Sequence, residues 1–209
     1  NVQFTYALVF ETHTITTGAD GAWSVFAADI DSDGDIDVIS GSYEDNTIAW
    51  YENNGNEVFY EHIISLSALQ AVSVFAADID SDGDMDILSS SVEDDKVAWY
   101  ENNGNEVFSE HTISSSTYTN PYSVFAADLD SDGDMDVLSV GAMSDKVSWF
   151  ENNGNQSFTD YTIAEYPIVD GPTSVFAIDV DGDGDLDVLS SSYNDDKIIW
   201  YENMMSCDE

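Results

Sequence analysis

Basic side chains are almost absent from this sequence. Its 209 residues include 43 acidic residues but only three lysines and no arginine, so the formal net charge is −40. Such a charge repels the phosphates of nucleic acids and of anionic membrane surfaces. We therefore expect no nucleic-acid partner, and we expect the chain to depend on cations.

Cysteine and long apolar runs are equally scarce. The one cysteine, Cys207, excludes an internal disulfide framework. No apolar run approaches the ~20 residues of a membrane-spanning helix, so we expect no membrane span in this fragment. The chain begins at Asn1 and carries no signal peptide, which predicts a mature piece of a longer protein. Hydrophobic residues at 43% and aromatic residues at 12% still predict a folded core.

The sequence contains one unit repeated four times. The segment SVFAADIDSDGDIDVIS at 24–40 recurs, with few changes, at 73–89, 123–139 and 174–190. A second block, AWYENNGNEVF at 49–59, recurs at 98–108, in altered form at 148–158, and in its first residues at 199–203. The period of 49, 50 and 51 residues is longer than that of the common helical repeats and lies in the range of propeller blades.

Each repeat predicts four short strands. They are SVFAAD, the run that follows the aspartates, KVAWYEN, and VFxEHTI as at 107–113. The last two are joined by Asn-Asn-Gly-Asn, whose Asn-Gly pair is a strong signal for a tight hairpin turn. Paired alanines in the first strand favour a crowded position near a propeller axis. The predicted fold is all-β, a β-propeller of four-stranded blades.

The chain ends suggest how such a propeller closes. Residues 9–15 match the fourth strand of a repeat, and the chain closes on a third-type strand at 198–203. We therefore predict that the N-terminal strand completes the last blade. The predicted organisation is an extension at 1–8, the four-repeat propeller at 9–203 and a tail at 204–209. Closure of four blades alone, and a homo-oligomeric eight-bladed ring of two chains, both remain open.

Length differences between the repeats fall in one place. Only the link from the fourth strand to the first strand of the next repeat varies. In an up-and-down blade this link shares a face with the turn between the second and third strands. The acidic loops lie on the other, uniform face. Because divergent loops on a uniform scaffold usually carry specificity, we expect a protein or glycan ligand on the variable face.

The clearest chemical motif is D-x-D-x-D-G-D-x-D, present once per repeat. Oxygen ligands without histidine or cysteine select calcium over zinc or copper. The first, second, third and fifth aspartates are expected to offer side-chain oxygens, and the fourth a backbone carbonyl. The predicted metal residues are Asp29, Asp31, Asp33, Asp35 and Asp37; Asp78, Asp80, Asp82, Asp84 and Asp86; Asp128, Asp130, Asp132, Asp134 and Asp136; and Asp179, Asp181, Asp183, Asp185 and Asp187.

Two other interpretations of this motif fit the sequence less well. An EF-hand needs flanking helices and a glutamate at loop position 12, where the first repeat has Ser40 and both flanks are strand-like. A solvated acidic turn without metal does not explain four recurrences in register. Two carboxylates 4 Å apart repel by ~4 kcal/mol at an effective dielectric of 20, so four converging carboxylates need a divalent cation. We expect about four Ca²⁺ per chain.

The segment SVFAADIDSDGDMDILS at 73–89, followed by KVAWYENNGN at 96–105, resembles the FG-GAP/VCBS repeats, which are known from the propeller of integrin alpha subunits. The resemblance covers residues 9–203. It implies structural calcium in the loop between the first and second strands, ligands bound on the opposite face, and an extracellular or cell-surface location.

Other recurrent residues favour packing over chemistry. Trp50, Trp99, Trp149 and Trp200 occupy one position per repeat. Such residues can stack on sugars, but they more often pack blade against blade. The recurrent histidines are replaced by Tyr161 in the third repeat. There is no nucleophile elbow and no phosphate-binding glycine loop, and the paired carboxylates are assigned to metal, so we predict a protein that is not an enzyme.

The sequence favours a calcium-stabilised extracellular propeller that serves adhesion, binding or assembly within a larger surface or secreted protein. A carbohydrate-binding lectin is the first alternative. It would use aromatic side chains of the variable face, namely Trp23, Tyr43, Tyr118, Tyr122 and Tyr193. The non-catalytic propeller of a secreted hydrolase is the second.

Overall fold

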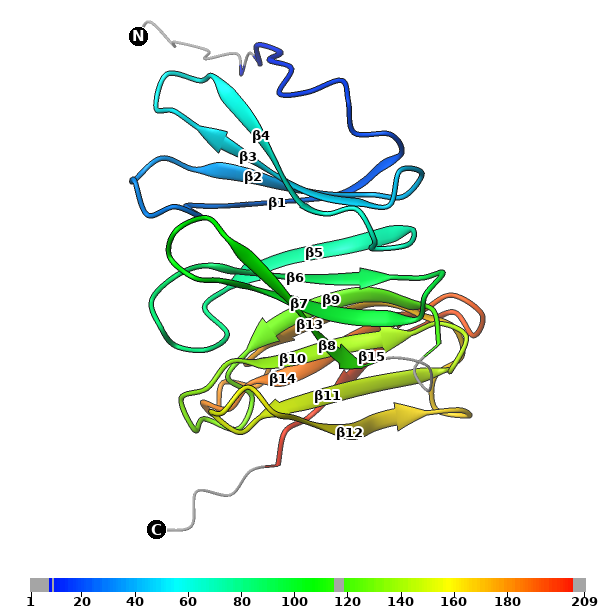
Figure 1. The fold of residues 1–209 in the computed structure, drawn as a ribbon. Coiled ribbons are helices and arrows are strands. Elements are labelled where there is room, and N and C mark those ends of the chain that lie inside the picture. Colours follow the sequence, from blue (N-terminus) through cyan, green and yellow to red (C-terminus); the bar gives the residue numbers. More distant parts are fainter. Residues whose placement is uncertain (1–7, 9, 115–118, 205–209) are drawn as a thin grey trace, which may run out of the picture.

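The computed structural model describes residue 8 and residues 10–114 and 119–204. These residues form fifteen β-strands in four antiparallel sheets (Figure 1). The described residues contain no helix that could cross a membrane. The predicted all-β class is confirmed, and each sheet corresponds to one sequence repeat.

The strand bounds follow the repeat. The first sheet contains β1 (Ala22–Ala28), β2 (Asp37–Ser42), β3 (Thr47–Asn53) and β4 (Phe59–Ser65). The second contains β5 (Ala71–Ala77), β6 (Asp86–Ser91), β7 (Lys96–Asn102) and β8 (Phe108–Ser114). The third contains β9 (Pro121–Ala127), β10 (Asp136–Gly141), β11 (Lys146–Asn152) and β12 (Phe158–Glu165). The fourth contains β13 (Pro172–Ile178), β14 (Asp187–Ser192) and β15 (Lys197–Tyr201).

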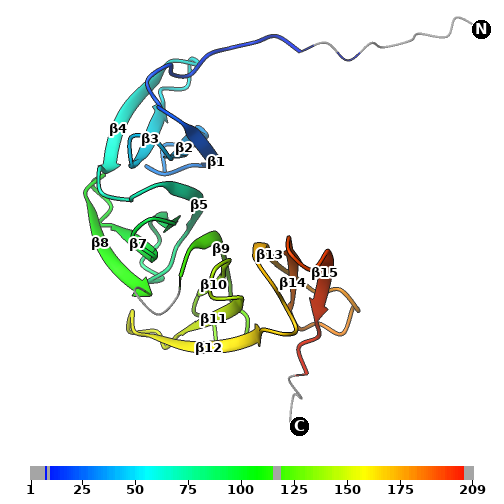
Figure 2. The same cartoon turned by 90° about the vertical axis from the view of Figure 1, so that its right-hand side faces the viewer.

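The four sheets lie side by side in an open arc (Figure 2). The first strand of each repeat lies on the inner side, so that β1 contacts β5, β5 contacts β9 and β9 contacts β13. The fourth strands β4, β8 and β12 lie on the outer side. This arrangement is blade-like, as the paired alanines of the inner strands predicted.

The core lies between neighbouring sheets. One cluster joins Ile39, Ile48 and Trp50 of the first repeat to Val74 and Ile87 of the second. Equivalent clusters join the second repeat to the third and the third to the fourth. Trp50 and Trp99 are fully buried in these interfaces, as expected for side chains that pack blade against blade.

The N-terminal strand is where the structure departs from the sequence-based expectation. The fourth sheet has three strands, and residues 10–15 do not form a strand in it. The first and fourth sheets are the two ends of the arc, so a segment joined to β1 lies far from β15 (Figure 2). The prediction that this segment completes the last blade of its own chain is therefore wrong for this structure. The proposed extension at 1–8, except Leu8, and the tail beyond Met204, including Cys207, lie outside the described residues.

Candidate metal centre

The aspartate motif forms the loop between the first two strands of every repeat. Asp29 follows β1 directly and Asp37 begins β2, so the motif fills the connection. Gly34, at its centre, has a φ of 96°, a conformation that side chains with a β-carbon rarely adopt. Ser32 is also in the left-handed region, with a φ of 61°. These two residues turn the chain back on itself and bring the aspartates together.

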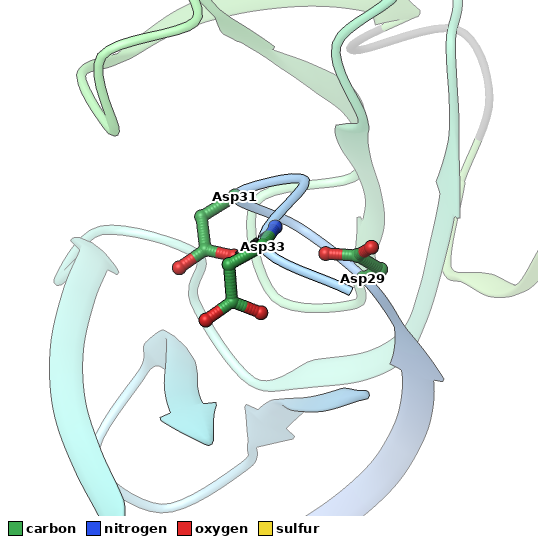
Figure 3. A group of neighbouring side chains, drawn as sticks. All are labelled: Asp29, Asp31 and Asp33. Carbon is green, nitrogen blue, oxygen red and sulfur yellow. Dashed lines mark hydrogen bonds between the residues drawn. The ribbon is translucent and has the colours of Figure 1, made fainter. Parts of the chain in front are cut away.

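Three aspartates of the first loop converge. Asp29, Asp31 and Asp33 each offer one carboxylate oxygen, and these oxygens lie within 4.8 Å of one another (Figure 3). The second and third loops converge in the same way, through Asp78, Asp80 and Asp82 and through Asp128, Asp130 and Asp132. In the fourth loop the group consists of Asp179, Asp181 and Asp187. The structure thus places one such group in each repeat.

Backbone donors hold the carboxylates of the first loop in place. The N–H of Gly34 donates to Oδ2 of Asp29 at 3.1 Å. The N–H of Asp33 donates to Oδ1 of Asp31 at 3.1 Å, and that of Asp35 donates to Oδ1 of Asp33 at 2.8 Å. Oδ1 of Asp29 is buried and has no hydrogen-bond partner among the described residues. A buried carboxylate oxygen without a donor is costly, and a bound cation would remove that cost.

The electrostatics of the loops oppose a bare site. Loss of solvation, together with repulsion from neighbouring carboxylates, raises the pKa of Asp31, Asp80 and Asp130. A divalent cation among the carboxylates reverses this repulsion. The donor set therefore suits a hard, oxygen-preferring cation, in keeping with the ligand chemistry inferred from the motif.

The fifth aspartate of the motif is placed differently in the first three repeats. Asp37, Asp86 and Asp136 are completely buried and lie outside the groups of three. Oδ2 of Asp86 accepts from the N–H of Ile79 at 2.9 Å, and Oδ1 accepts from the N–H of Asn102 at 2.7 Å. Burial raises the pKa of Asp86 to about 7 and that of Asp136 to about 6, although the two backbone donors to each carboxylate lower it. These carboxylates tie the loop to the end of the third strand.

The fourth aspartate of the motif packs its side chain on the hairpin turn between the third and fourth strands. A β-carbon on Gly55, Gly104 or Gly154 would overlap the carboxylate of Asp35, Asp84 or Asp134, respectively. The expected role of these aspartates as backbone-carbonyl ligands leaves their side chains available for this contact. The aspartate motif alone does not indicate this contact, although the constant Asn-Asn-Gly-Asn turn is a signal that a side chain packs there.

The opposite face collects the turns between second and third strands and the variable links. The N–H of Asn120 donates to Oδ1 of Asp95 at 2.8 Å, which joins the two kinds of loop across neighbouring repeats. Of the aromatic residues expected there, Trp23 stacks on Tyr43 with a ring-centroid distance of 5.3 Å. Tyr122 and Tyr193 line a shallow hollow of about 390 Å³ together with Asn120 and Asn194. Tyr118 lies outside the described residues.

Solved structures with a similar fold are known. An auxiliary nutrient binding protein from Bacteroides ovatus has a TM-score of 0.59 at 11% identity, over 88% of this chain and 46% of that one. A catalytically inactive virginiamycin B lyase from Staphylococcus aureus, solved with quinupristin, has a TM-score of 0.55 at 14% identity, over 92% of this chain and 59% of that one. The biofilm matrix protein Bap1 of V. cholerae has a TM-score of 0.49 at 18% identity, over 93% of this chain and 33% of that one.

The chain thus spans about half the length of the first two structures. At these identities the similarity to the first two structures concerns the fold alone. No curated protein matches the sequence.

The sequence also matches a family model. The model describes an FG-GAP-like repeat and matches residues 29–89, 90–139 and 136–190, which include all four aspartate loops. The matched residues make up more than half of the chain, and the match confirms the resemblance drawn from the repeated motif. This chain belongs to the FG-GAP-like repeat family.

Proposed function

We propose that this chain is a calcium-stabilised extracellular module that serves adhesion, binding or assembly within a larger secreted or surface protein. The observation that supports it best is the fourfold group of three converging aspartates, one in every repeat. Calcium would be held by these carboxylates and would neutralise part of the chain's net charge of −40. Its role is structural, because it fixes the loop between the first two strands of each blade.

The proposed location follows from the metal. Extracellular calcium is millimolar, so even a site with a dissociation constant of ~10⁻⁴ M would be mostly filled there. With free calcium at about ten times that constant, each site would stabilise the folded state by roughly 1.4 kcal/mol, and four sites together by roughly 6 kcal/mol. Without the ion, the converging carboxylates repel one another and the loops loosen.

Thermal melting in calcium and in excess chelator tests the structural role. We expect a substantially higher melting temperature in calcium, and magnesium should protect less because the smaller ion demands a stricter geometry. An unchanged melting temperature after chelation would contradict the proposal. A matched melt in calcium of a variant with one aspartate removed from each of the four loops should resemble the chelated protein.

A second candidate function is carbohydrate binding on the variable face. It is favoured by the hollow in which Tyr122 of the third repeat and Tyr193 of the fourth lie beside two asparagines. Tyr193 is 80% exposed, so its ring is free to stack on a sugar. A glycan array in the presence of calcium tests it, with Tyr193→Ala as the binding-deficient variant. Tyr60→Ala, on the outer strand β4, is the control. Absence of any glycan binding would remove this candidate.

A further inference from the structure

The two ends of the arc expose side chains that are buried everywhere else in it. On the first sheet Val25 is 70% exposed, whereas its equivalents Val74, Val124 and Val175 are 5%, 4% and 5% exposed. We call the surface of the first sheet that carries Val25, Ala27 and Val38 the leading face. In the other three repeats the same surface is covered by the preceding repeat.

The fourth sheet shows the opposite surface. Ile198 is 87% exposed, whereas its equivalents Ile48, Val97 and Val147 are completely buried. Trp200 is 43% exposed, and Trp50 and Trp99 are fully buried. We call the surface with Ile198, Trp200 and Val180 the trailing face. In the first three repeats it is covered by the next repeat, so the arc ends in two complementary halves of one interface.

A column of phenylalanine rings shows the same complementarity. Phe26 contacts Phe75, Phe75 contacts Phe125 and Phe125 contacts Phe176, with ring centroids 4.5, 4.9 and 4.7 Å apart. Phe176, the last ring of the column, is 45% exposed. A phenylalanine in the position of Phe26, on the first sheet of another copy, would continue the column beyond Phe176.

Polar groups repeat across the interface as well. The N–H of Val74 donates to Oγ of Ser24 at 3.2 Å, and the two later interfaces repeat this bond between Val124 and Ser73 and between Val175 and Ser123. The next acceptor in the series is Ser174, which is exposed on the trailing face. Its matching donor is the N–H of Val25 on the leading face.

An asparagine at the end of the third strand makes a second hydrogen bond that recurs between neighbouring repeats. Nδ2 of Asn102 donates to the carbonyl of Ile30 at 3.3 Å, and Nδ2 of Asn152 donates to that of Ile79 at 2.9 Å. The equivalent of these carbonyls at the trailing end belongs to Val180, which is 45% exposed. Asn53 of the first repeat is the asparagine that would match it.

The trailing end also has a hollow where a fourth strand would lie. A pocket of about 270 Å³ opens between the third and fourth sheets, and its apolar lining includes Leu129, Trp149, Ile163, Leu186, Tyr201 and Met204. At the first interface Phe108 of β8 packs edge-on to Trp50, at a centroid distance of 6.4 Å. The equivalent phenylalanine for Trp149 would come from a fourth strand of the last sheet.

Residues 10–15, FETHTI, match FSEHTI at 108–113 of β8. Phe10 is therefore the equivalent of Phe108, and His13 is the equivalent of His111. His111 stacks on Trp99 at 4.6 Å, and its Nε2 lies 2.7 Å from a carboxylate oxygen of Glu101. In the fourth repeat, Trp200 and Glu202 are the equivalents of Trp99 and Glu101. A histidine from an added fourth strand would make the same two contacts with them.

The connection decides which sheet this segment can reach. Ile15 precedes Val25 by ten residues, as Ile64 precedes Val74 in the link between the first and second sheets. In that link the strand before it, β4, belongs to the first sheet, and the chain then continues into β5 of the second sheet. By the same geometry residues 10–15 belong to a sheet that lies against the leading face. The chain's own fourth sheet is at the other end of the arc (Figure 2).

We propose that two copies of this chain associate head to tail, with the leading face of one copy on the trailing face of the other. Residues 10–15 of each copy then add beside β15 of its partner as the fourth strand of that sheet. Two arcs joined at both ends make a closed ring, in which both terminal sheet faces are covered. The inner strand β1 carries no charged residue, so this part of the contact does not add to the mutual repulsion of two acidic chains.

The test is the mass in solution, by light scattering in calcium-containing buffer at physiological salt. One chain is 22.9 kDa, and we expect the wild-type protein at twice that mass. Val25→Asp and Ile198→Asp should each reduce the mass to that of one chain. Both side chains are largely exposed in the single arc, so each variant should retain its strand content by circular dichroism. Val107→Asp, on an exposed turn of the second repeat, is the control that should stay associated.

Mixing the two variants distinguishes head-to-tail pairing from other modes. A pair formed by one Val25→Asp copy and one Ile198→Asp copy retains one wild-type interface, so the equimolar mixture should recover the doubled mass. A mixture that stays monomeric at concentrations where the wild type is fully associated would contradict the proposal. So would a monomeric wild type, or a Val25→Asp variant that still associates.

Phe10→Asp tests the exchanged strand separately. We expect the dissociation constant to rise at least tenfold, and an unchanged constant would contradict strand exchange. None of these variants touches an aspartate loop, so calcium binding should remain as in the wild type. Failure of this inference is therefore distinguishable from failure of the proposed calcium role.

Discussion

The side chain of Asp84 packs so closely on Gly104 that a β-carbon on the glycine would overlap the carboxylate. This contact joins the metal loop of the second repeat to the hairpin turn between β7 and β8. It recurs in the first and third repeats through Asp35 with Gly55 and Asp134 with Gly154. The acidic loop and the hairpin turn therefore form one structural unit at the uniform face.

Replacing this glycine should destabilise the fold in a way that a second substitution partly reverses. Gly104→Ala combines the overlap with a φ of 71°, and we expect it to lower the free energy of unfolding by at least about 1 kcal/mol. Asp84→Ala in the same chain removes the overlap and should restore part of the loss in urea denaturation. Gly83→Ala has no atom near its added β-carbon, so Asp84→Ala should not rescue it.

The buried aspartates should matter through hydrogen bonding. Asp86→Ala leaves the N–H groups of Ile79 and Asn102 without their acceptor, and we expect a loss of about 2–4 kcal/mol in the free energy of unfolding. Asp86→Asn retains one acceptor oxygen and should lose less. Urea denaturation of both variants, in calcium, measures the difference. Equal losses for the two variants would contradict the assigned role.

Within one loop, the first and fourth aspartates should behave differently toward calcium. Asp29 belongs to the converging group, and its Oδ1 has no other partner among the described residues, so Asp29→Ala should reduce the number of bound ions by one. Asp35→Ala retains the backbone carbonyl at that position and should leave the number unchanged. Calorimetric titration provides the count. Asp20→Ala, an exposed residue outside the motif, is the matched control.

Calcium removal should loosen the loops before it loosens the sheets. Hydrogen exchange followed by mass spectrometry should show faster exchange at 29–37, 78–86, 128–136 and 179–187 after chelation. Strands β6 and β10, buried along their whole length, should remain protected. Uniform exchange across the chain would instead indicate that the ion supports the entire fold at once.

Much of this arrangement could be predicted from the sequence, because the same strand, turn and loop patterns recur from repeat to repeat. The alternation of KVAWYEN and the Asn-Gly turn predicted β7 and its hairpin, and the motif predicted which loops carry the acids. The side-chain position of Asp37 could not be predicted, since spacing alone does not reveal that the N–H groups of Ile30 and Asn53 point at its carboxylate.

The position of the N-terminal segment could not be predicted for a related reason. The segment at 10–15 has the sequence of a fourth strand, but sequence similarity does not specify which copy of the repeat it pairs with. Whether it reaches the last sheet depends on the curvature of the arc, which arises from packing between sheets such as that of Phe75 on Phe125. Curvature of this kind is a property of the assembled interfaces and leaves no motif in the chain.

The number of calcium ions bound per chain tests the central claim most directly. Equilibrium dialysis of the metal-free protein against radioactive calcium, with physiological salt to suppress diffuse binding to the acidic surface, measures it. The four aspartate groups predict four ions per chain, saturating at submillimolar calcium. Binding of less than one ion per chain, or binding that rises without saturation, would contradict the account.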